Sequence, residues 1–367
     1  MNDADAQRAF ARKDFHDSIE RFDRYGCSLY RTLAGRCEQD DALVEIAAAA
    51  RPGQLPAFML YTAVQYLLMG GEGGDPLARY FGSTCAAPLP AQDAFGPFRD
   101  FCLRHRAAIE GLISINTLQS TMPGRVSYLL PALAHIGRQA GAPLAVIDVG
   151  CSAGITTIAD CFACDYGGGV RLGAADARLT VGCELQPGSE ALPAAPVRIA
   201  ARLGLDLNPV DVADEAACRW LLAQLPPEPR VDQQELAAAL AIRRDTPLRV
   251  VTGDALALLP TLAAELDGPL CVMHASVLYQ WPEPLRDALD AILEGIGRGR
   301  TVHRLGVERM ISSPRPVQAF RAGSLLDDQT VIVHTIYERG TRRMRYHGEV
   351  DGRGKTLRWT DEAIPDG

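Results

Sequence analysis

The sequence predicts an α/β protein in which a helical N-terminal region precedes a mainly parallel sheet. Before residue 140, apolar residues recur at helical spacing and no strand-like alternation appears. After it, short apolar runs rich in β-branched residues alternate with helical stretches, the pattern of a buried parallel sheet. Since 367 residues suit about two domains, we expect a helical region over residues 1–122 and a sheet domain over residues 123–367.

The helices of the N-terminal region are expected from their apolar spacing and end signals. Phe15, Ile19 and Phe22 recur at the spacing of one helix face. Pro56 opens another helix, because proline fits the first turn, and a glycine-rich run ends it. A further helix is expected over residues 94–113.

Six short apolar runs predict the strands of the sheet domain. They lie at residues 144–150, 179–184, 248–252, 270–274, 301–307 and 331–337. Helical stretches are expected between them at residues 214–225, 233–244 and 284–294. Asp351-Gly352 is a hairpin signal that separates two final strands within residues 344–359.

Composition excludes several classes of protein. The chain is 47% hydrophobic and 22% charged, close to the usual globular mix, which argues against a disordered chain. No apolar run reaches the roughly 20 residues of a membrane helix, and the N-terminus lacks an export signal. We therefore expect a cytoplasmic protein with no membrane partner, whose ten cysteines are reduced thiols.

The charge pattern favours a small-molecule partner over nucleic acid. The net charge is −8, and arginines gather only in residues 298–358, without interleaved aromatic residues that stack on bases. An anionic small substrate or a solvated surface accounts better for that segment. Cys161 and Cys164 form a CxxC pair with no second pair at zinc-finger spacing, so no metal is expected. The oligomeric state leaves no signal in the sequence.

Residues 146–156 (VIDVGCSAGIT) predict a strand, a tight turn of small residues and the start of a helix. Such a turn lets a ligand approach the backbone, as suits a nucleotide-containing cofactor at the carboxyl edge of a sheet. A dinucleotide-binding G-x-G-x-x-G fits poorly. Asp148, Gly150 and Gly154 match the acid-x-G-x-G-x-G pattern of methyltransferase-type Rossmann folds, with Ser152 in place of the middle glycine.

The same turn has other interpretations. It reads G-x-S-x-G, the nucleophile elbow of α/β hydrolases, and Asp254 and His274 follow Ser152 in the hydrolase order. However, a hydrolase has several strands ahead of its serine, whereas this chain has helices there. Ester hydrolysis also leaves Asp148 unexplained. A different Rossmann ligand and a purely structural turn remain further alternatives.

Polar residues lie at or just after the ends of three of the expected strands. Glu184 closes one of them, where an acid can accept hydrogen bonds from ribose hydroxyls, provided that residues 162–178 form an inserted loop. Asp254 would accept from an adenine amino group, or cap the next helix. His274 would take a proton from an acceptor near neutral pH, with a structural histidine as the alternative.

Other polar residues have structural interpretations as well. Residues 205–211 (LDLNPVD) predict a polar turn with two acids that either shapes the site or caps the following helix. His303 and His334 lie within strand patterns and are expected to be core or face residues.

Segments spread over nearly the whole chain carry a family resemblance. They include GQLP at 53–56, AVQYLL at 63–68, PLARYF at 76–81, VGCSAG at 149–154, RLGLDLNP at 202–209, GDA at 253–255 and HASVL at 274–278. Together they make the chain similar to a bacterial family known as an uncharacterised domain of unknown function. The resemblance implies a class I methyltransferase fold with a helical N-terminal region, and it assigns no reaction.

The chain departs from that family pattern in two places. Gln65 stands where the family tends to have a histidine. Residues 119–125 read QSTMPGR where the family tends to have Gln-Thr-Asn-Glu-x-x-Arg, so the Asn-Glu pair is missing while Gln119 and Arg125 remain. If this segment covers the cofactor, Arg125 would pair with the cofactor carboxylate; the alternative is an arginine on a helix surface.

These residues predict an S-adenosylmethionine-dependent methyltransferase that acts on a small-molecule acceptor. The turn would hold the methionine end of the cofactor, Glu184 the ribose and Asp254 the adenine. The expected cofactor-binding residues are Arg125, Asp148, Gly150, Ser152, Gly154, Glu184 and Asp254, and the expected catalytic residue is His274. The alternatives are a protein that binds S-adenosylmethionine or a nucleotide without turnover, and a serine hydrolase that uses Ser152.

Overall fold

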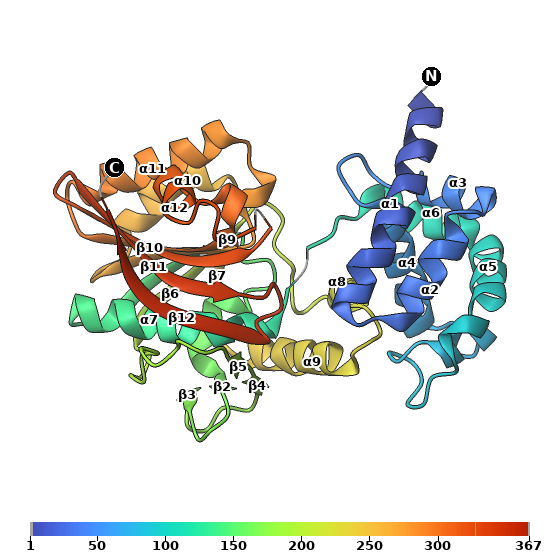
Figure 1. The fold of residues 1–367 in the computed structure, drawn as a ribbon, viewed down its shortest axis with the longest axis horizontal. Coiled ribbons are helices and arrows are strands. Elements are labelled where there is room, and N and C mark those ends of the chain that lie inside the picture. The colour runs from blue at the N-terminus through green and yellow to red at the C-terminus, as the bar shows by residue number, and fades with distance from the viewer. Residues whose placement is uncertain (1–2, 120, 327, 366–367) are drawn as a thin grey trace. The chain divides into compact units, whose positions relative to one another are not determined.

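In the computed structural model, which describes residues 3–119, 121–326 and 328–365, the chain divides into a helical unit and a sheet unit (Figure 1). The helical unit comprises residues up to 121 together with residues 211–237, and the sheet unit comprises the remainder. The sequence placed a boundary after residue 122. It also assigned residues 211–237 to the sheet domain, whereas this segment belongs to the helical unit.

The helical unit is built around buried aromatic rings. Its helices are α1 (Asp3–Tyr25), α2 (Ser28–Cys37), α3 (Asp41–Ala47), α4 (Pro56–Gly70), α5 (Phe95–Arg104), α6 (Arg106–Ile115) and α8 (Glu215–Ala223). Tyr30 and Tyr61 are buried and stack with 4.6 Å between ring centroids. Pro56 opens α4 as expected. Gln65 is buried and donates to the carbonyl oxygens of Ala223 and Leu225, which makes it a structural residue of this unit.

Within the described residues of the sheet unit, nine strands form one mixed sheet in the order β5-β12-β11-β10-β9-β8-β1-β6-β7. These strands are β1 (Leu144–Val149), β5 (Glu184–Leu185), β6 (Ile199–Asp206), β7 (Arg249–Thr252), β8 (Leu270–Ala275), β9 (Val302–Arg309), β10 (Thr330–Glu338), β11 (Thr341–Val350) and β12 (Thr356–Ile364). Strands β7, β6, β1, β8 and β9 are parallel, and β10 to β12 continue the sheet antiparallel. The protein is therefore of mixed α/β class.

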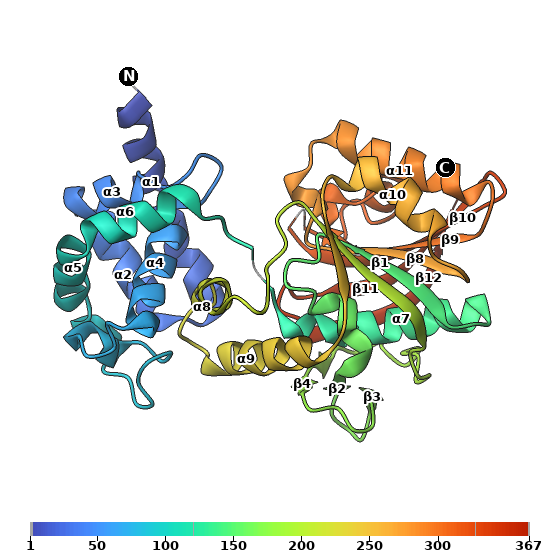
Figure 2. The same cartoon turned by 180° about the vertical axis from the view of Figure 1, so that it is seen from behind.

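The order of the five parallel strands reverses at β1. From β1 the chain moves outward through β6 to β7, then returns to the other side of β1 for β8 and β9. Helix α7 (Val126–Ala140) covers one face of the sheet, and α10 (Ala255–Ala264) and α11 (Glu283–Gly297) cover the other (Figures 1 and 2). The remaining helices are α9 (Arg230–Asp245) and α12 (Arg315–Phe320).

Two strand expectations need correction. Residues 179–184 do not form a strand beside β1: β4 (Thr180–Gly182) pairs with β2 (Ala163–Asp165) in a small separate sheet that includes β3 (Arg171–Gly173), and Glu184 begins the edge strand β5. The presumed inserted loop therefore contains two of these strands. The second parallel strand, β6, escaped the sequence analysis because IAARLGLD has a single β-branched residue and reads as a weak strand.

No helix in the described parts of the chain is long and apolar enough to cross a membrane.

Candidate functional site

The carboxyl ends of β1, β6 and β7 meet at one edge of the sheet. The N–H of Gly150 donates to the Leu205 carbonyl (2.8 Å), and the N–H of Gly253 donates to the Asp206 carbonyl (2.9 Å). β8, on the other side of β1, ends at the same edge. In open α/β sheets, ligands bind outside the carboxyl ends where the strand order reverses. This edge, at the end of β1, is the candidate site.

In the glycine-rich turn after β1, every second residue from Gly150 to Gly154 has a positive φ angle, in the left-handed backbone region. The φ angles are 75° at Gly150, 50° at Ser152 and 77° at Gly154. The Ser152 N–H donates to Asp206 Oδ2 at 2.8 Å, which ties the turn to the end of the neighbouring strand. Because such angles strain residues with a Cβ, glycine is favoured at the first and third of these positions.

Packing also requires the two glycines. A Cβ at Gly150 would lie 2.4 Å from Val277 Cγ2, and a Cβ at Gly154 would lie 2.5 Å from Leu248 Cδ2. Protein side chains therefore occupy the space that the missing Cβ atoms leave. The glycines alone are not evidence that a ligand approaches the backbone at these points.

The segment after the turn is a short 3-10 helix, Thr156–Cys161, in place of the expected α-helix. Ile158 within it has non-helical angles (φ −104°, ψ 28°). The run Ile155-Thr156-Thr157-Ile158 is β-branched throughout, which disfavours an α-helix.

Asp148 holds this segment from the end of β1. Its Oδ2 accepts hydrogen bonds from the hydroxyls of Thr156 (2.6 Å) and Thr157 (2.7 Å). The side chain is buried, and burial raises the pKa of Asp148 to about 6, although these hydrogen bonds and the charge of Arg125 act in the opposite direction. Asp148 therefore shapes the turn from inside the protein, and any contribution it makes to ligand binding is indirect.

Asp206, rather than Glu184, ends the second parallel strand. The Asp206 carboxylate accepts from the backbone N–H groups of Ser152 and Asn208, both at 2.8 Å. Glu184 is exposed on the edge strand β5, where its N–H donates to the Lys355 carbonyl (2.8 Å). The reasoning that assigned Glu184 to a ribose assumed that residues 179–184 form the strand beside β1, and the strand order contradicts that premise.

Asp254 follows β7 and caps α10. Its Oδ1 accepts from the Leu256 N–H at 2.8 Å, which was the structural alternative for this residue. The side chain is exposed, and the preceding Gly253 is hydrogen-bonded to the end of β6. Asp254 therefore lies on the loop next to Asp206 and keeps acceptor capacity for a ligand.

Arg125 is buried beside the end of β8. It ends the 3-10 turn Pro123–Arg125 before α7, and its Nη1 donates to the Ala275 carbonyl at 3.3 Å. The side chain is only 8% exposed, and its Nε has no hydrogen-bond partner among the described residues. A buried guanidinium N–H without a partner costs free energy, so this group favours an anionic ligand.

His274 is buried at the end of β8 within a network of charged side chains. Its Nδ1 lies 2.8 Å from Glu308 Oε1, and its Nε2 lies 2.9 Å from Arg304 Nε. Since the guanidinium can only donate, His274 Nε2 accepts and Nδ1 carries the proton that is donated to Glu308. Burial lowers the pKa of His274, which keeps the ring neutral.

This network leaves His274 with no nitrogen to take a proton from a substrate, contrary to the role expected for a catalytic base. Glu308 also accepts from the Val277 N–H at 3.0 Å. Arg304 in turn pairs with Asp290. The network therefore positions the loop after β8, in which Val277 packs against Gly150. We assign His274 to positioning and not to proton transfer.

The hydrolase arrangement is not assembled at this edge. A serine nucleophile needs a histidine that accepts its proton and an acid that orients that histidine. The ring nitrogens of His274 are engaged by Glu308 and Arg304, and Asp254 caps a helix. The φ of 50° at Ser152 is the one elbow-like feature of this turn.

A cavity of about 350 Å³ lies beside α11 and β9 and is lined by charged side chains. Two ion pairs lie in its wall, Arg304 with Asp290 and Arg315 with Glu283.

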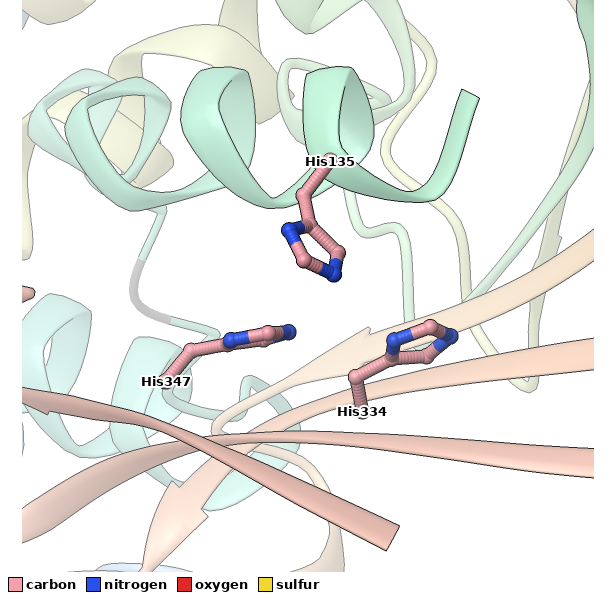
Figure 3. Close-up of side chains that lie close together, drawn as sticks. All are labelled: His135, His334 and His347. Atoms are coloured by element: carbon pink, nitrogen blue, oxygen red, sulfur yellow. The ribbon is translucent and has the colours of Figure 1, made fainter. Parts of the chain in front are cut away.

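A further cluster, which the sequence analysis missed, lies between α7 and the sheet. His135, His334 and His347 are buried, and one nitrogen of each lies within 4.8 Å of the others (Figure 3). The sequence predicted no metal and assigned His334 to the core or a sheet face. Only the β10–β11 register brings the two strand histidines together, and that register is interrupted by a bulge at His347.

The model of a family described as an uncharacterised protein conserved in bacteria, DUF2332, matches residues 12–359. No curated protein and no solved structure matches the chain.

Proposed function

The chain belongs to this uncharacterised bacterial family, and we propose that it is an S-adenosylmethionine-dependent methyltransferase that acts on a small-molecule acceptor. The proposal rests chiefly on the strand order. Numbered along the chain, the five parallel strands lie in the order third, second, first, fourth, fifth. This is the order of nucleotide-binding Rossmann sheets, whose ligands lie where the order reverses.

The side chains at that edge suit the ends of the cofactor. Arg125 has a buried Nε without a partner among the described residues, beside the end of β8. A guanidinium fork binds a carboxylate through two parallel hydrogen bonds, and the methionine part of the cofactor carries a carboxylate. Arg125 therefore supports binding of that end, next to the glycine-rich turn.

The two acids after β6 and β7 suit the nucleoside. Asp206 takes the ribose role that the sequence had assigned to Glu184, because it ends the strand next to β1. It already accepts two backbone N–H groups, and a carboxylate has about four acceptor positions, so ribose hydroxyls can bind as well. Asp254, on the adjoining loop, would accept from the adenine amino group.

When bound, the cofactor supplies an electrophilic methyl group on a sulfonium. The protein has to hold the acceptor in line with that group, which depends on positioning more than on acid–base chemistry. Arg125 and Asp254 would bind the two ends of the ligand, and Asp206 the ribose between them. His274, through Glu308 and the Val277 N–H, fixes the loop after β8. In this account the proton that the acceptor loses goes to solvent or to the acceptor's own groups.

One observation favours a second candidate, a protein that binds S-adenosylmethionine without turnover. The histidine expected to act as a base is fully engaged by Arg304 and Glu308. The two candidates share the binding site and differ in methyl transfer alone. Incubation of the protein with methyl-labelled S-adenosylmethionine and a bacterial metabolite extract separates them, since only the transferase moves label into other small molecules.

The binding site is tested by calorimetric titration of S-adenosylhomocysteine into paired variants. Arg125→Lys keeps the charge but loses the guanidinium fork, and Asp206→Asn keeps one acceptor oxygen but loses the charge. We expect each to weaken binding at least about tenfold, or about 1.4 kcal/mol. Glu184→Gln is the matched control and should bind like the wild type. Loss of binding in Glu184→Gln alone would contradict the assignment.

A further inference from the structure

Four of the chain's seven histidines gather in one place on the face of the sheet that α7 covers. His135 comes from α7, His334 from β10 and His347 from β11, and their rings converge in the layer between helix and sheet (Figure 3). His303 on β9 adjoins them, with its Nδ1 at 3.0 Å from His334 Nε2. None of these side chains takes part in the proposed cofactor site.

The cluster contains buried nitrogen atoms that lack hydrogen-bond partners. His334 and His347 are 0% exposed and His135 is 4% exposed. Among the described residues, His135 Nε2, His334 Nδ1 and both nitrogens of His347 have no hydrogen-bond partner. A buried polar atom without a partner is destabilising, and several such atoms facing one another indicate that something binds between them.

Two of the three histidines have one ring nitrogen next to another polar side chain, as metal-binding histidines commonly do. His334 Nε2 faces His303 Nδ1, which leaves Nδ1 for a ligand. His347 Nδ1 lies 3.3 Å from Asp361 Oδ1, close enough for a small rotation to form a hydrogen bond and leave Nε2 for a ligand. Histidines that bind metals commonly donate their other N–H to a carboxylate or similar acceptor, which fixes the ring and its tautomer.

The surroundings restrain the rings and balance the local charge. The indole of Trp359 stacks on His347 at 4.8 Å with an interplanar angle of 8°. Two cations lie near the cluster: Arg138 on α7, and Arg345 on β11, which is paired with Asp361 at 2.7 Å. The site therefore presents buried imidazoles beside an ion pair whose charges balance.

We propose that His135, His334 and His347 bind a divalent transition metal ion, with Zn²⁺ as the expected occupant. Three imidazoles suit Zn²⁺, and a tetrahedral ion with bonds of about 2.0–2.1 Å holds its ligand nitrogens roughly 3.3 Å apart. The candidate nitrogens lie within 4.8 Å of one another, so side-chain rotation suffices to close the set. A water molecule completes the coordination.

The ion would connect α7 to the antiparallel part of the sheet. His135 lies on α7 ten residues after Arg125, which immediately precedes this helix, and ten helical residues span about 15 Å at 1.5 Å per residue. The metal site is thus separate from the cofactor edge. The proposal does not depend on methyl transfer, so either one can fail without the other.

The test uses the full chain, purified without a histidine tag, treated with a chelator and titrated with Co²⁺ and with Zn²⁺. We expect one metal ion per chain, visible d–d absorption of the Co²⁺ form without a thiolate charge-transfer band, and a higher Tm with Zn²⁺. His334→Gln and His347→Gln should weaken binding at least about 100-fold, and His303→Gln about 10-fold. His16→Gln, at an exposed histidine of the helical unit, should bind like the wild type.

Three results would overturn the proposal. One is a chelator-treated wild-type protein that binds neither ion and keeps the same Tm when Zn²⁺ is added. Another is a strong thiolate charge-transfer band, which would place the ion on cysteines such as Cys164 and Cys183. The third is equal metal affinity in the wild type and the folded His347→Gln variant. The first two readouts use the wild type alone, so they decide the question even where a variant fails to fold.

Discussion

At the scale of single residues, the buried carboxyl of Asp148 makes the stability of the protein depend on pH. Its carboxylate accepts two threonine hydroxyls that hold the segment after β1 in place. Burial raises its pKa to about 6, above the ordinary value of 3.8. The unfolded chain therefore ionises at a lower pH than the folded protein, and the stability that depends on this group declines as the pH rises from about 4 through 6.

Asp148→Asn tests this linkage. The amide keeps an acceptor for the threonine hydroxyls but cannot ionise, so the variant does not lose stability over this pH range. We therefore expect the difference in unfolding free energy, variant minus wild type, to rise by up to about 3 kcal/mol between about pH 4 and pH 7. Urea denaturation across this range measures the difference. A difference in unfolding free energy that does not change with pH would show that the pKa of Asp148 is not raised in the folded protein.

At the residue scale, much of the candidate site was predictable from the sequence, and the errors have physical causes. Asp148 was placed correctly at the end of the first strand, and Gly150, Ser152 and Gly154 on the turn after it, because a buried strand followed by small residues is a strong local signal. Glu184 was misplaced because β6 reads as a weak strand. The partners of His274 are on β9, a long-range contact that no local pattern encodes.

At the scale of elements, the turn after β1 and the loop after β8 are packed as one piece. Val277 fills the space that a Cβ at Gly150 would occupy, since that Cβ would lie 2.4 Å from Val277 Cγ2. Glu308, which is hydrogen-bonded to His274, accepts from the Val277 N–H. A change on either loop should therefore disturb the other.

Gly150→Ala combines two costs, a positive φ and a clash with Val277. We expect the variant to lose about 2–4 kcal/mol of unfolding free energy, as measured by urea denaturation. Gly141→Ala is the matched control, because Gly141 also has a positive φ (69°) but its Cβ would meet nothing within 4 Å. It should lose only about 1 kcal/mol. Equal losses in the two variants would contradict the packing account.

The elements themselves divide into those with local signals and those without. The strands β1, β7, β8, β9 and β10 were expected from β-branched runs, and the hairpin of β11 and β12 from Asp351-Gly352. Strand β6, the small sheet of β2 to β4 and the bulge at His347 were not, because their pairing is set by tertiary contacts. The histidine cluster depends on that bulge and on α7, so it could not be predicted from spacing.

At the scale of the whole molecule, the strand order determines where a ligand belongs. The four strand ends at the candidate site are spread along the chain from Val149 to Ala275, and they meet because the strand order reverses at β1. The segment 211–237, which the chain contributes to the helical unit, interrupts the sheet unit between β6 and β7. Sequence patterns predicted the order of elements along the chain, but they did not predict that residues 211–237 pack with the helical unit.

A bound ligand should leave a pattern across the sheet unit that hydrogen exchange can detect. With saturating S-adenosylhomocysteine, we expect slower exchange in the loops after β1, β6, β7 and β8, because ligand binding suppresses local opening. The edge strand β5, which carries Glu184, is the internal reference and should not change. Protection that is confined to β5 and β12 would place the ligand at the wrong end of the sheet.

The central claim is that the edge at the end of β1 binds S-adenosylmethionine. The most direct measurement is calorimetric titration of the wild-type protein with S-adenosylmethionine and S-adenosylhomocysteine, with NADH as the control ligand. The account predicts one site per chain with micromolar affinity for the two sulfur compounds and no binding of NADH. Binding of NADH alone, or of none of the three, would contradict it.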